Sequence, residues 1–161
     1  MSQISSVQTE THLFPVNSTF AAHANIRSEE HYQSMVERAN SDYEGYWGDL
    51  AQQYIDWHTP FTTVLNQENA PFYKWFQEGK LNVSYNCLDR HLLTHPHKAA
   101  IIFESDAGHV ETVTYKELHH KVCRFANGLK TLGVVKGDRV VIYLPNSIEA
   151  IIAMQACARI G

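Results

Sequence analysis

The first regular pattern of apolar positions lies in the first third of the chain. Apolar residues recur there at the three- and four-residue spacing of an α-helix, in two runs: Tyr32, Met35, Val36 and Ala39, then Tyr43, Tyr46, Trp47, Leu50 and Tyr54. Ser28 can cap the first run, and Glu29 and Glu30 add the negative charge that favours a first helical turn. Ser41 and Glu44 have the spacing of a capping box for the second run. The pattern therefore predicts two consecutive helices.

Residues 57–83 show no such period and are rich in aromatic side chains. The rings are those of Trp57, Phe61, Phe72, Tyr73, Trp75 and Phe76. We expect a long irregular segment that lies flat on another surface and buries its rings there. A platform on which a ligand stacks is the alternative. Lys74 is the single Lys or Arg among the rings, which argues against a nucleic-acid ligand.

A helix and a hairpin are predicted in the middle of the chain. One helical face is shared by Tyr85, Leu88, His91 and Leu92. This helix must end before Pro96, because a residue that precedes proline avoids the helical conformation. Residues 99–104 and 110–114 are predicted strands, joined by a turn at residues 105–109.

The strongest periodic pattern follows this hairpin. Apolar residues keep one helical face for five turns: Tyr115, Leu118, Val122, Phe125, Ala126, Leu129 and Leu132. Thr114 and Glu117 form a capping box at its start, and Gly133 ends it. A nearly all-apolar strand is predicted over residues 139–144, and a helix that is apolar on most sides over residues 145–160. The fold class is therefore α/β: an N-terminal helical and irregular region, then the incomplete start of a doubly wound, layered α/β domain.

Composition excludes several classes of protein. The 161 residues include 13 Lys and Arg against 17 Asp and Glu, a net charge of −4, so no basic footprint for nucleic acid is expected. No apolar run approaches the length of a membrane span, and the N-terminus has no basic stretch followed by an apolar one, as a secretory signal would. Cys87, Cys123 and Cys157 fall in helical patterns. We expect them to be buried and reduced, which favours a cytoplasmic location.

Several segments form recognisable motifs: residues 71–76, 79–91, 114–118, 122–127, 136–145 and 156–161. Together they resemble the acetyl-CoA synthetases, a branch of the adenylate-forming acyl-CoA ligases. Lys-Gly-Asp-Arg-Val-Val at residues 136–141 is common to many of these ligases, whereas Asn-Cys-Leu-Asp-Arg-His at residues 86–91 is narrower and indicates the short-chain branch. The resemblance covers residues 28–161 and implies an N-terminal cap at residues 28–83 and the start of the AMP-binding domain at residues 84–161. Residues 1–27 lie outside it, and because they are polar and aperiodic we expect a mobile leader there or one that wraps a surface. The aromatic segment would then be a strap against the sheet domain.

The resemblance also implies a reaction. Members of this family convert acetate, ATP and coenzyme A into acetyl-CoA, AMP and pyrophosphate through an acetyl-adenylate, with Mg²⁺. Their phosphate loop, acyl pocket, Mg²⁺-associated residues, catalytic lysine and coenzyme A-binding arginines all lie downstream of the part that this chain resembles. We therefore assign no catalytic, cofactor-binding or metal-ligating residue to residues 1–161, and we expect this chain alone to be inactive.

Partners and alternatives follow from the same comparison. The expected partner is the remainder of the ligase chain, with acetate, ATP and coenzyme A as substrates of the whole protein and neither nucleic acid nor membrane as a partner. Uncovered sheet surface also favours self-association. One alternative is a stand-alone interaction module that pairs with itself or with a full-length ligase. Another is a fragment of a propionyl-CoA synthetase or of another short-chain acyl-CoA synthetase.

Three motifs contain residue types that occur in metal-binding, catalytic or phosphate-binding sites. His91 and His95 have the i, i+4 spacing of a metal pair, with His97 close by, but no acidic or cysteine ligand is fixed beside them. Asp89 and Arg90 favour a structural charge pair or a cap at a junction over a catalytic carboxylate. The remaining motif is the set of glycines Gly133, Gly137 and Gly161, whose spacing is not that of a phosphate loop.

Overall fold

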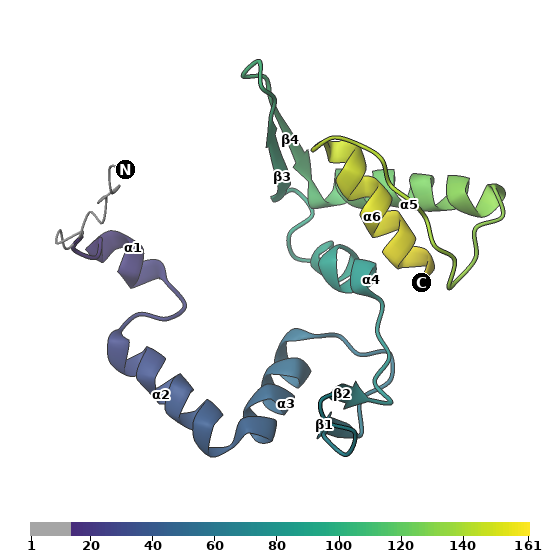
Figure 1. Ribbon diagram of the computed structural model, residues 1–161. Coiled ribbons are helices and arrows are strands. Elements are labelled where there is room, and N and C mark those ends of the chain that lie inside the picture. The colour runs from purple at the N-terminus through teal and green to yellow at the C-terminus, as the bar shows by residue number, and fades with distance from the viewer. Residues whose placement is uncertain (1–13) are drawn as a thin grey trace, which may run out of the picture. The chain divides into compact units, whose positions relative to one another are not determined.

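The computed structural model describes residues 14–161 (Figure 1). They fall into two compact units, divided in the sequence between Tyr46 and Trp47. The first unit holds α1 (Ser18–His23), α2 (Glu29–Ser41) and the start of α3 (Tyr43–Tyr54), which continues into the second unit. The predicted leader, residues 1–27, lies partly outside the described residues. Its described part contains α1, which the sequence pattern did not predict. Asn17 caps this short helix by accepting the N–H of Phe20 at 3.0 Å.

The two N-terminal helices are confirmed, but one of their caps was assigned wrongly. Ser28 caps α2 as predicted, with its Oγ accepting the N–H of His31 at 3.2 Å. The capping box of Ser41 and Glu44 does not form, because Ser41 is the last residue of α2. Asp42 is the non-helical residue between the helices, so its carboxylate can reach the new helix and accepts the N–H of Gly45 at 3.1 Å.

The aromatic segment contains a hairpin rather than irregular chain throughout. Strands β1 (Thr63–Asn66) and β2 (Lys74–Gln77) pair antiparallel, with Leu65 opposite Trp75. Four-residue strands are too short to show a period of two, which is why the pattern missed them. The rings of Trp57, Phe61 and Phe76 pack on one another, with centroids 5.0–5.7 Å apart. These three rings are half-buried within the segment itself, whereas Phe72, Tyr73 and Trp75 are exposed, contrary to the expectation that the segment buries its rings.

The middle of the chain follows the predicted order with one break. A single helix through Leu92 is wrong: α4 (Val83–Cys87) ends at Leu88, whose φ of −124° is not helical, and a 3-10 turn, η1 (Asp89–His91), follows. The side chain of Leu88 at this break is buried in the hydrophobic core. Strands β3 (Ala99–Glu104) and β4 (Val110–Thr114) form the predicted antiparallel hairpin.

Part of the helical face predicted after the hairpin lies in the hydrophobic core, whereas Phe125 and Leu132 on that face are exposed. Helix α5 (Tyr115–Thr131) begins with the predicted capping box of Thr114 and Glu117. Helix α6 (Ile148–Ile160) packs against α5 and α4 (Figure 1), and begins after Ser147, slightly later than predicted. The buried core side chains are Leu88, Val113, Leu118, Val122, Ala126, Ile148, Ile152 and Ala156.

The predicted strand at residues 139–144 is not a strand. The segment is free of regular secondary structure and has no ladder partner among residues 14–161. Val141 and Tyr143 are 91% and 99% exposed, and Ile151 and Met154 on α6 are also exposed. An apolar pattern indicates that a segment prefers burial, but a strand also needs a neighbouring strand for its backbone hydrogen bonds.

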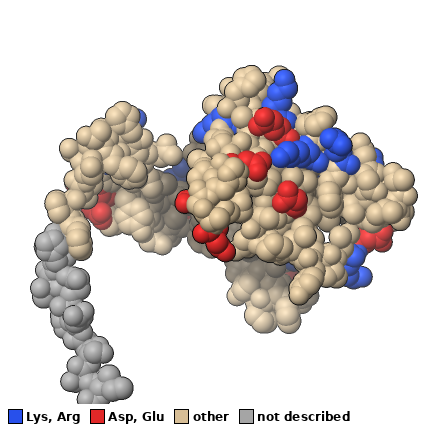
Figure 2. All heavy atoms as spheres, turned by 90° about the horizontal axis from the view of Figure 1, so that it is seen from above, with Lys and Arg blue, Asp and Glu red and all other residues tan. Residues whose placement is uncertain are grey.

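Charges are mixed on the surface of the larger body. Figure 2 shows Lys and Arg side chains interspersed with Asp and Glu side chains on the face in view, with no extended area of one sign. Within the part of the chain that the structure describes, no helix combines the length and the apolar character needed to cross a membrane.

Candidate functional site

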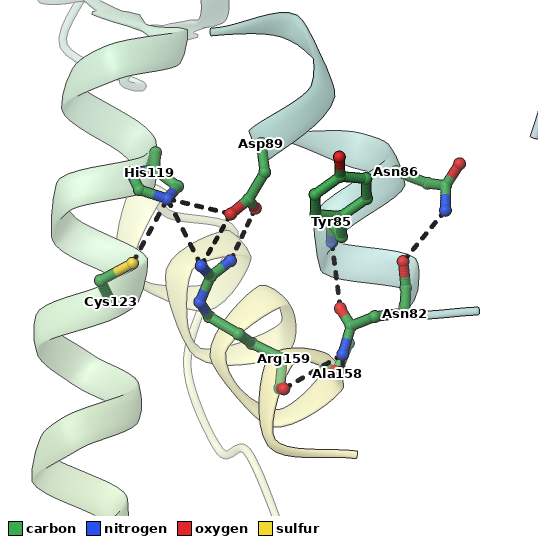
Figure 3. A network of polar contacts seen from close by, with 8 residues as sticks. All are labelled: Asn82, Tyr85, Asn86, Asp89, His119, Cys123, Ala158 and Arg159. Carbon is green, nitrogen blue, oxygen red and sulfur yellow. Dashed lines mark hydrogen bonds and ion pairs between the residues drawn. The ribbon is translucent and has the colours of Figure 1, made fainter. Parts of the chain in front are cut away.

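A network of polar side chains joins three helical segments of the larger unit (Figure 3). Asp89, at the start of η1, accepts two hydrogen bonds from the guanidinium of Arg159 on α6, at 2.6 and 2.7 Å. His119 on α5 places its Nε2 at 3.2 Å from Asp89 Oδ1 and 3.4 Å from Arg159 Nη2. The Sγ of Cys123, one turn further along α5, is 3.5 Å from the same nitrogen. Asp89 therefore lies between α5 and α6.

Asn82 extends the network to the end of α6. Its Oδ1 accepts the N–H of Tyr85 at 3.0 Å and so caps α4. Its Nδ2 donates to the carbonyls of Ala158 and Arg159, at 3.2 and 3.1 Å. The side-chain amide of Asn82 thus forms hydrogen bonds with both the first turn of α4 and the last turn of α6, as Figure 3 shows.

A second set of contacts fixes the segment between α3 and the hairpin. Asn86 accepts the N–H of Asp56 at 2.8 Å and donates to its carbonyl at 3.0 Å. Arg90 donates to the carbonyl of Tyr54 at 2.7 Å and lies 3.6 Å from the carboxylate of Asp56. The indole N–H of Trp57 donates a hydrogen bond to the carbonyl of Ala51 at 2.9 Å. These contacts tie residues 51–57 to α4 and η1.

The electrostatics of the network keep its charges paired. The hydrogen bonds from Arg159 are the main cause that lowers the pKa of the Asp89 carboxyl, and burial opposes them. The same pair raises the pKa of Arg159. Both carboxylate oxygens of Asp89 are occupied, so this group is a poor general base and a poor open metal ligand. The arrangement is suited to holding elements together.

A pocket of about 600 Å³ lies beside this network. Asp89, Arg159 and Asn82 form part of its wall, and the rest includes Trp57 and Tyr85. In the wall, the guanidinium of Arg159 is already paired with Asp89, so it is not available as a free anion-binding group.

The other sequence candidates have ordinary surroundings. The ring of His91 packs against Tyr115, with centroids 5.4 Å apart, and His95 Nδ1 lies 2.7 Å from the hydroxyl of Thr94. No group of three or more His, Cys, Asp or Glu side chains between residues 14 and 161 is placed to hold a metal ion. Asp89 and Arg90, expected as one structural pair, each have different partners.

The cysteine prediction holds in part. Cys87, Cys123 and Cys157 are all free thiols. Cys87 is exposed, contrary to the expectation of burial, and the other two are half-buried. The reason is that α4 is short and turns Leu88 rather than Cys87 into the core.

Sequence reasoning did not single out Asn82, His119 and Arg159. Asn82 carried a usable signal, because asparagine directly before a helix is a common N-cap. The bond between Asp89 and Arg159 joins residues 70 positions apart and has no local signal.

Comparisons with known proteins agree on one family. A family model described as the acetyl-coenzyme A synthetase N-terminus matches residues 32–87, and one described as AMP-binding enzyme matches residues 88–161. Acetyl-coenzyme A synthetases of Thiobacillus denitrificans and Nitrosomonas europaea are 62% and 59% identical over all 161 residues, which cover 25% of each relative. The chain therefore spans about a quarter of the length of these relatives.

A solved structure is similar as well. The acetoacetyl-CoA synthetase from Streptomyces lividans matches with a TM-score of 0.74 and 29% identity, over 89% of this chain and 22% of that one. The polar network spans both matched regions, since Asn82 lies in the first, and Asp89 and Arg159 lie in the second.

Proposed function

This chain is homologous to the N-terminal portion of acetyl-coenzyme A synthetases, and we propose that it belongs to an AMP-forming acetate–CoA ligase. The observation that carries the proposal is the 62% identity to such a synthetase over the whole chain. The match to the AMP-binding enzyme family supports the use of ATP by the whole protein.

The proposed reaction has two steps. An oxygen of acetate bonds to the α-phosphorus of ATP, and pyrophosphate leaves, which gives acetyl-adenylate. The sulfur of coenzyme A then bonds to the acetyl carbon, AMP leaves, and the thiol proton is released. Mg²⁺ would offset the charge of the phosphates. The described residues do not fit a Mg²⁺ site, because none of their acidic side chains gather into a ligand group.

Within the whole protein, this chain supplies structure rather than chemistry. It comprises the leader (residues 1–27), the N-terminal cap (residues 28–83) and the start of the AMP-binding domain (residues 84–161). No catalytic, cofactor-binding or metal-ligating role is assigned to any of its residues, and the isolated chain should be inactive. The remainder of the ligase is its partner. The free thiols support a cytoplasmic location.

The first test is to read the coding sequence beyond the codon for Gly161. We expect it to continue into an apolar strand and a Gly-rich phosphate loop. The protein encoded by the whole gene should then catalyse acetate-dependent exchange of pyrophosphate into ATP and should form acetyl-CoA. Residues 1–161 alone, assayed beside it, should do neither. A stop codon after Gly161, or exchange that does not depend on acetate, would refute the proposal.

The choice of acid is tested in the same assay. Propionate and butyrate, offered in place of acetate, separate the acetate ligase from the alternative of another short-chain acyl-CoA synthetase. The expected order of kcat/KM is acetate above propionate above butyrate. A higher value for propionate would replace acetate as the proposed substrate.

A stand-alone interaction module is the second candidate. The exposed apolar side chains of Val141 and Tyr143 favour it, because a self-sufficient chain would cover them by association. Sedimentation and dye binding of the isolated chain test it together. A defined dimer that binds no hydrophobic dye favours the module, because its apolar surface is then covered. A self-associated chain that still binds the dye is what an uncovered fragment would give, and a monomer argues against the module.

A further inference from the structure

The last residues of α6 are held from three separate places in the chain. Asn82 donates to the carbonyls of Ala158 and Arg159. Asp89 accepts both hydrogen bonds from the guanidinium of Arg159. The N–H of Gly137 donates to the carbonyl of Gly161 at 2.8 Å. The last carbonyls of a helix have no partner within the helix, so the contacts from Asn82 and Gly137 satisfy groups that would otherwise need water.

Asn82 is placed to do this by its own helix. Its surroundings fix the orientation of the side-chain amide, because the N–H of Tyr85 requires an oxygen and the two carbonyls require an NH₂ group. Figure 3 shows the amide between the start of α4 and the end of α6. Asn82 thus ties the end of α6 directly to the start of α4, since it lies 76 positions before Ala158 in the chain.

Asp89 adds a second fixed point with a different geometry. Its two-point contact with the planar guanidinium sets the direction of the Arg159 side chain as well as its distance. His119 backs the carboxylate from α5. Because Asn82 and Asp89 flank α4, a shift of the end of α6 would have to break contacts at both ends of α4.

We propose that Asn82 and Asp89 are positioning residues for the acetate–CoA ligase. They hold the end of α6, from which the longer protein continues, and so set the position of the segment that follows it in the catalytic body. This inference rests on the proposed function, because it needs a longer chain with ligase activity. Neither residue is expected to touch a substrate.

Asn82→Ser in the full-length protein separates the two roles of this residue. Serine also caps helices well, so α4 should remain, but its hydroxyl is too short to keep both donor contacts to α6. Losing them should lower kcat for acetyl-CoA formation by about fivefold to tenfold, the order expected for one or two hydrogen bonds. KM for acetate and for ATP should change by less than about twofold, because the residue binds neither.

The matched control is Asn17→Ser. Asn17 caps α1 with the same side-chain oxygen, and no contact from its amide nitrogen to another helix end is seen in residues 14–161. This variant should retain the kcat of the wild type. An equal fall in kcat for both variants would mean that any change of a cap matters, and the positioning role would be rejected.

A double-mutant cycle tests whether the two fixed points act on the same helix end. Arg159→Lys keeps the charge but loses the two-point contact with Asp89. Combined with Asn82→Ser, its effect on kcat should be less than the product of the single effects, because both release α6. Fully multiplicative effects, or an unchanged kcat in Asn82→Ser, would overturn the proposal.

Amide hydrogen exchange separates this inference from the proposed function. Asn82→Ser should speed exchange at residues 157–161 and in the segment that follows them, without speeding it in β3 and β4. If the wild-type protein has no ligase activity, the proposed function fails, whatever the exchange shows. If activity is present but exchange at residues 157–161 is unchanged by Asn82→Ser, the positioning role fails alone.

Discussion

Asp89 links α5 and α6 within the polar network, because its carboxylate contacts both Arg159 and His119. Arg159 lowers the pKa of its carboxyl, so the charged form stabilises the folded state. A group with a lowered pKa contributes this stability above its unfolded pKa, near 3.9, and loses it as the pH falls through the folded value. We expect Asp89→Asn to lower stability by about 1–3 kcal/mol at pH 7, because Arg159 loses its charged partner.

The pH dependence makes this prediction specific. The difference in thermal midpoint between the wild type and Asp89→Asn should shrink as the pH falls below about 4. Glu111→Gln is the control, since Glu111 and Lys121 form an exposed pair at 3.8 Å that should contribute less than about 1 kcal/mol. A constant difference from pH 7 to pH 3 would show that the charge of Asp89 does not stabilise the fold.

Replacing Ser84 should not lower stability, unlike replacing Asp89. Ser84 is fully buried, and its hydroxyl has no hydrogen-bond partner among residues 14–161. Ser84→Ala should therefore be neutral or raise stability by up to about 1 kcal/mol. Ser147→Ala, which removes the Oγ that caps α6, should lower stability by about 1 kcal/mol. Thermal unfolding of both variants checks the pair, and a loss of stability in Ser84→Ala would contradict the prediction.

The hairpin element depends on a close approach at Gly79. The chain turns sharply just before it, with φ of 49° at Phe76 and 65° at Glu78. A Cβ at Gly79 would lie 2.6 Å from the ring of Trp57 and 2.9 Å from the carbonyl of Phe76. Gly79→Ala should thus disrupt the aromatic cluster and lower stability by about 1–3 kcal/mol. Tryptophan fluorescence should change as well.

Gly128→Ala is the matched substitution in a different element. Gly128 lies inside α5, and no atom is near the position of an added Cβ. Alanine there should raise stability by about 0.5–1 kcal/mol, since glycine weakens a helix interior. Thermal midpoints that move in the same direction for Gly79→Ala and Gly128→Ala would contradict the packing argument.

The elements that the sequence predicted well are those with local signals. The capping box of Thr114 and Glu117 and the period after it located α5, and the short turn between residues 104 and 110 located the β3–β4 hairpin. The pattern does not predict the β1–β2 hairpin, because its four-residue strands are too short to show a period of two. Residues 139–144 were assigned as a strand from apolar character alone, which says nothing about a partner.

The polar network could not be predicted from the sequence, because its contacts join residues that are far apart in the chain. The expected charge pair of Asp89 and Arg90 does not form, and Asp89 pairs with Arg159 instead. Its partner Arg159, however, is brought near by the packing of α6 against α4, which precedes Asp89. Local spacing can find a cap such as Asn82, but not the second helix that the same amide contacts.

At the scale of the whole molecule, the main feature is apolar surface left uncovered within residues 14–161. In the segment at residues 139–144, Val141 and Tyr143 point outward, whereas Ile142 between them is half-buried. Side chains alternate in this way along an extended segment that packs one face on the rest of its unit and leaves the other face exposed. The chain spans about a quarter of the length of its relatives. Under the proposed function, the remainder of the ligase would cover the outer face.

This surface leads to a prediction for the isolated chain, residues 1–161. It should bind a hydrophobic dye and self-associate, because an apolar segment with free backbone groups can pair with a second copy. Val141→Lys combined with Tyr143→Lys should reduce both by at least about half. Leu93→Lys is the control, since Leu93 is 96% exposed but lies outside this segment. Equal dye binding in both variants would mean that the dye binds to an apolar surface outside residues 139–144. Sharp unfolding of a monomer that binds no dye would show that the isolated chain is stable with this apolar surface exposed.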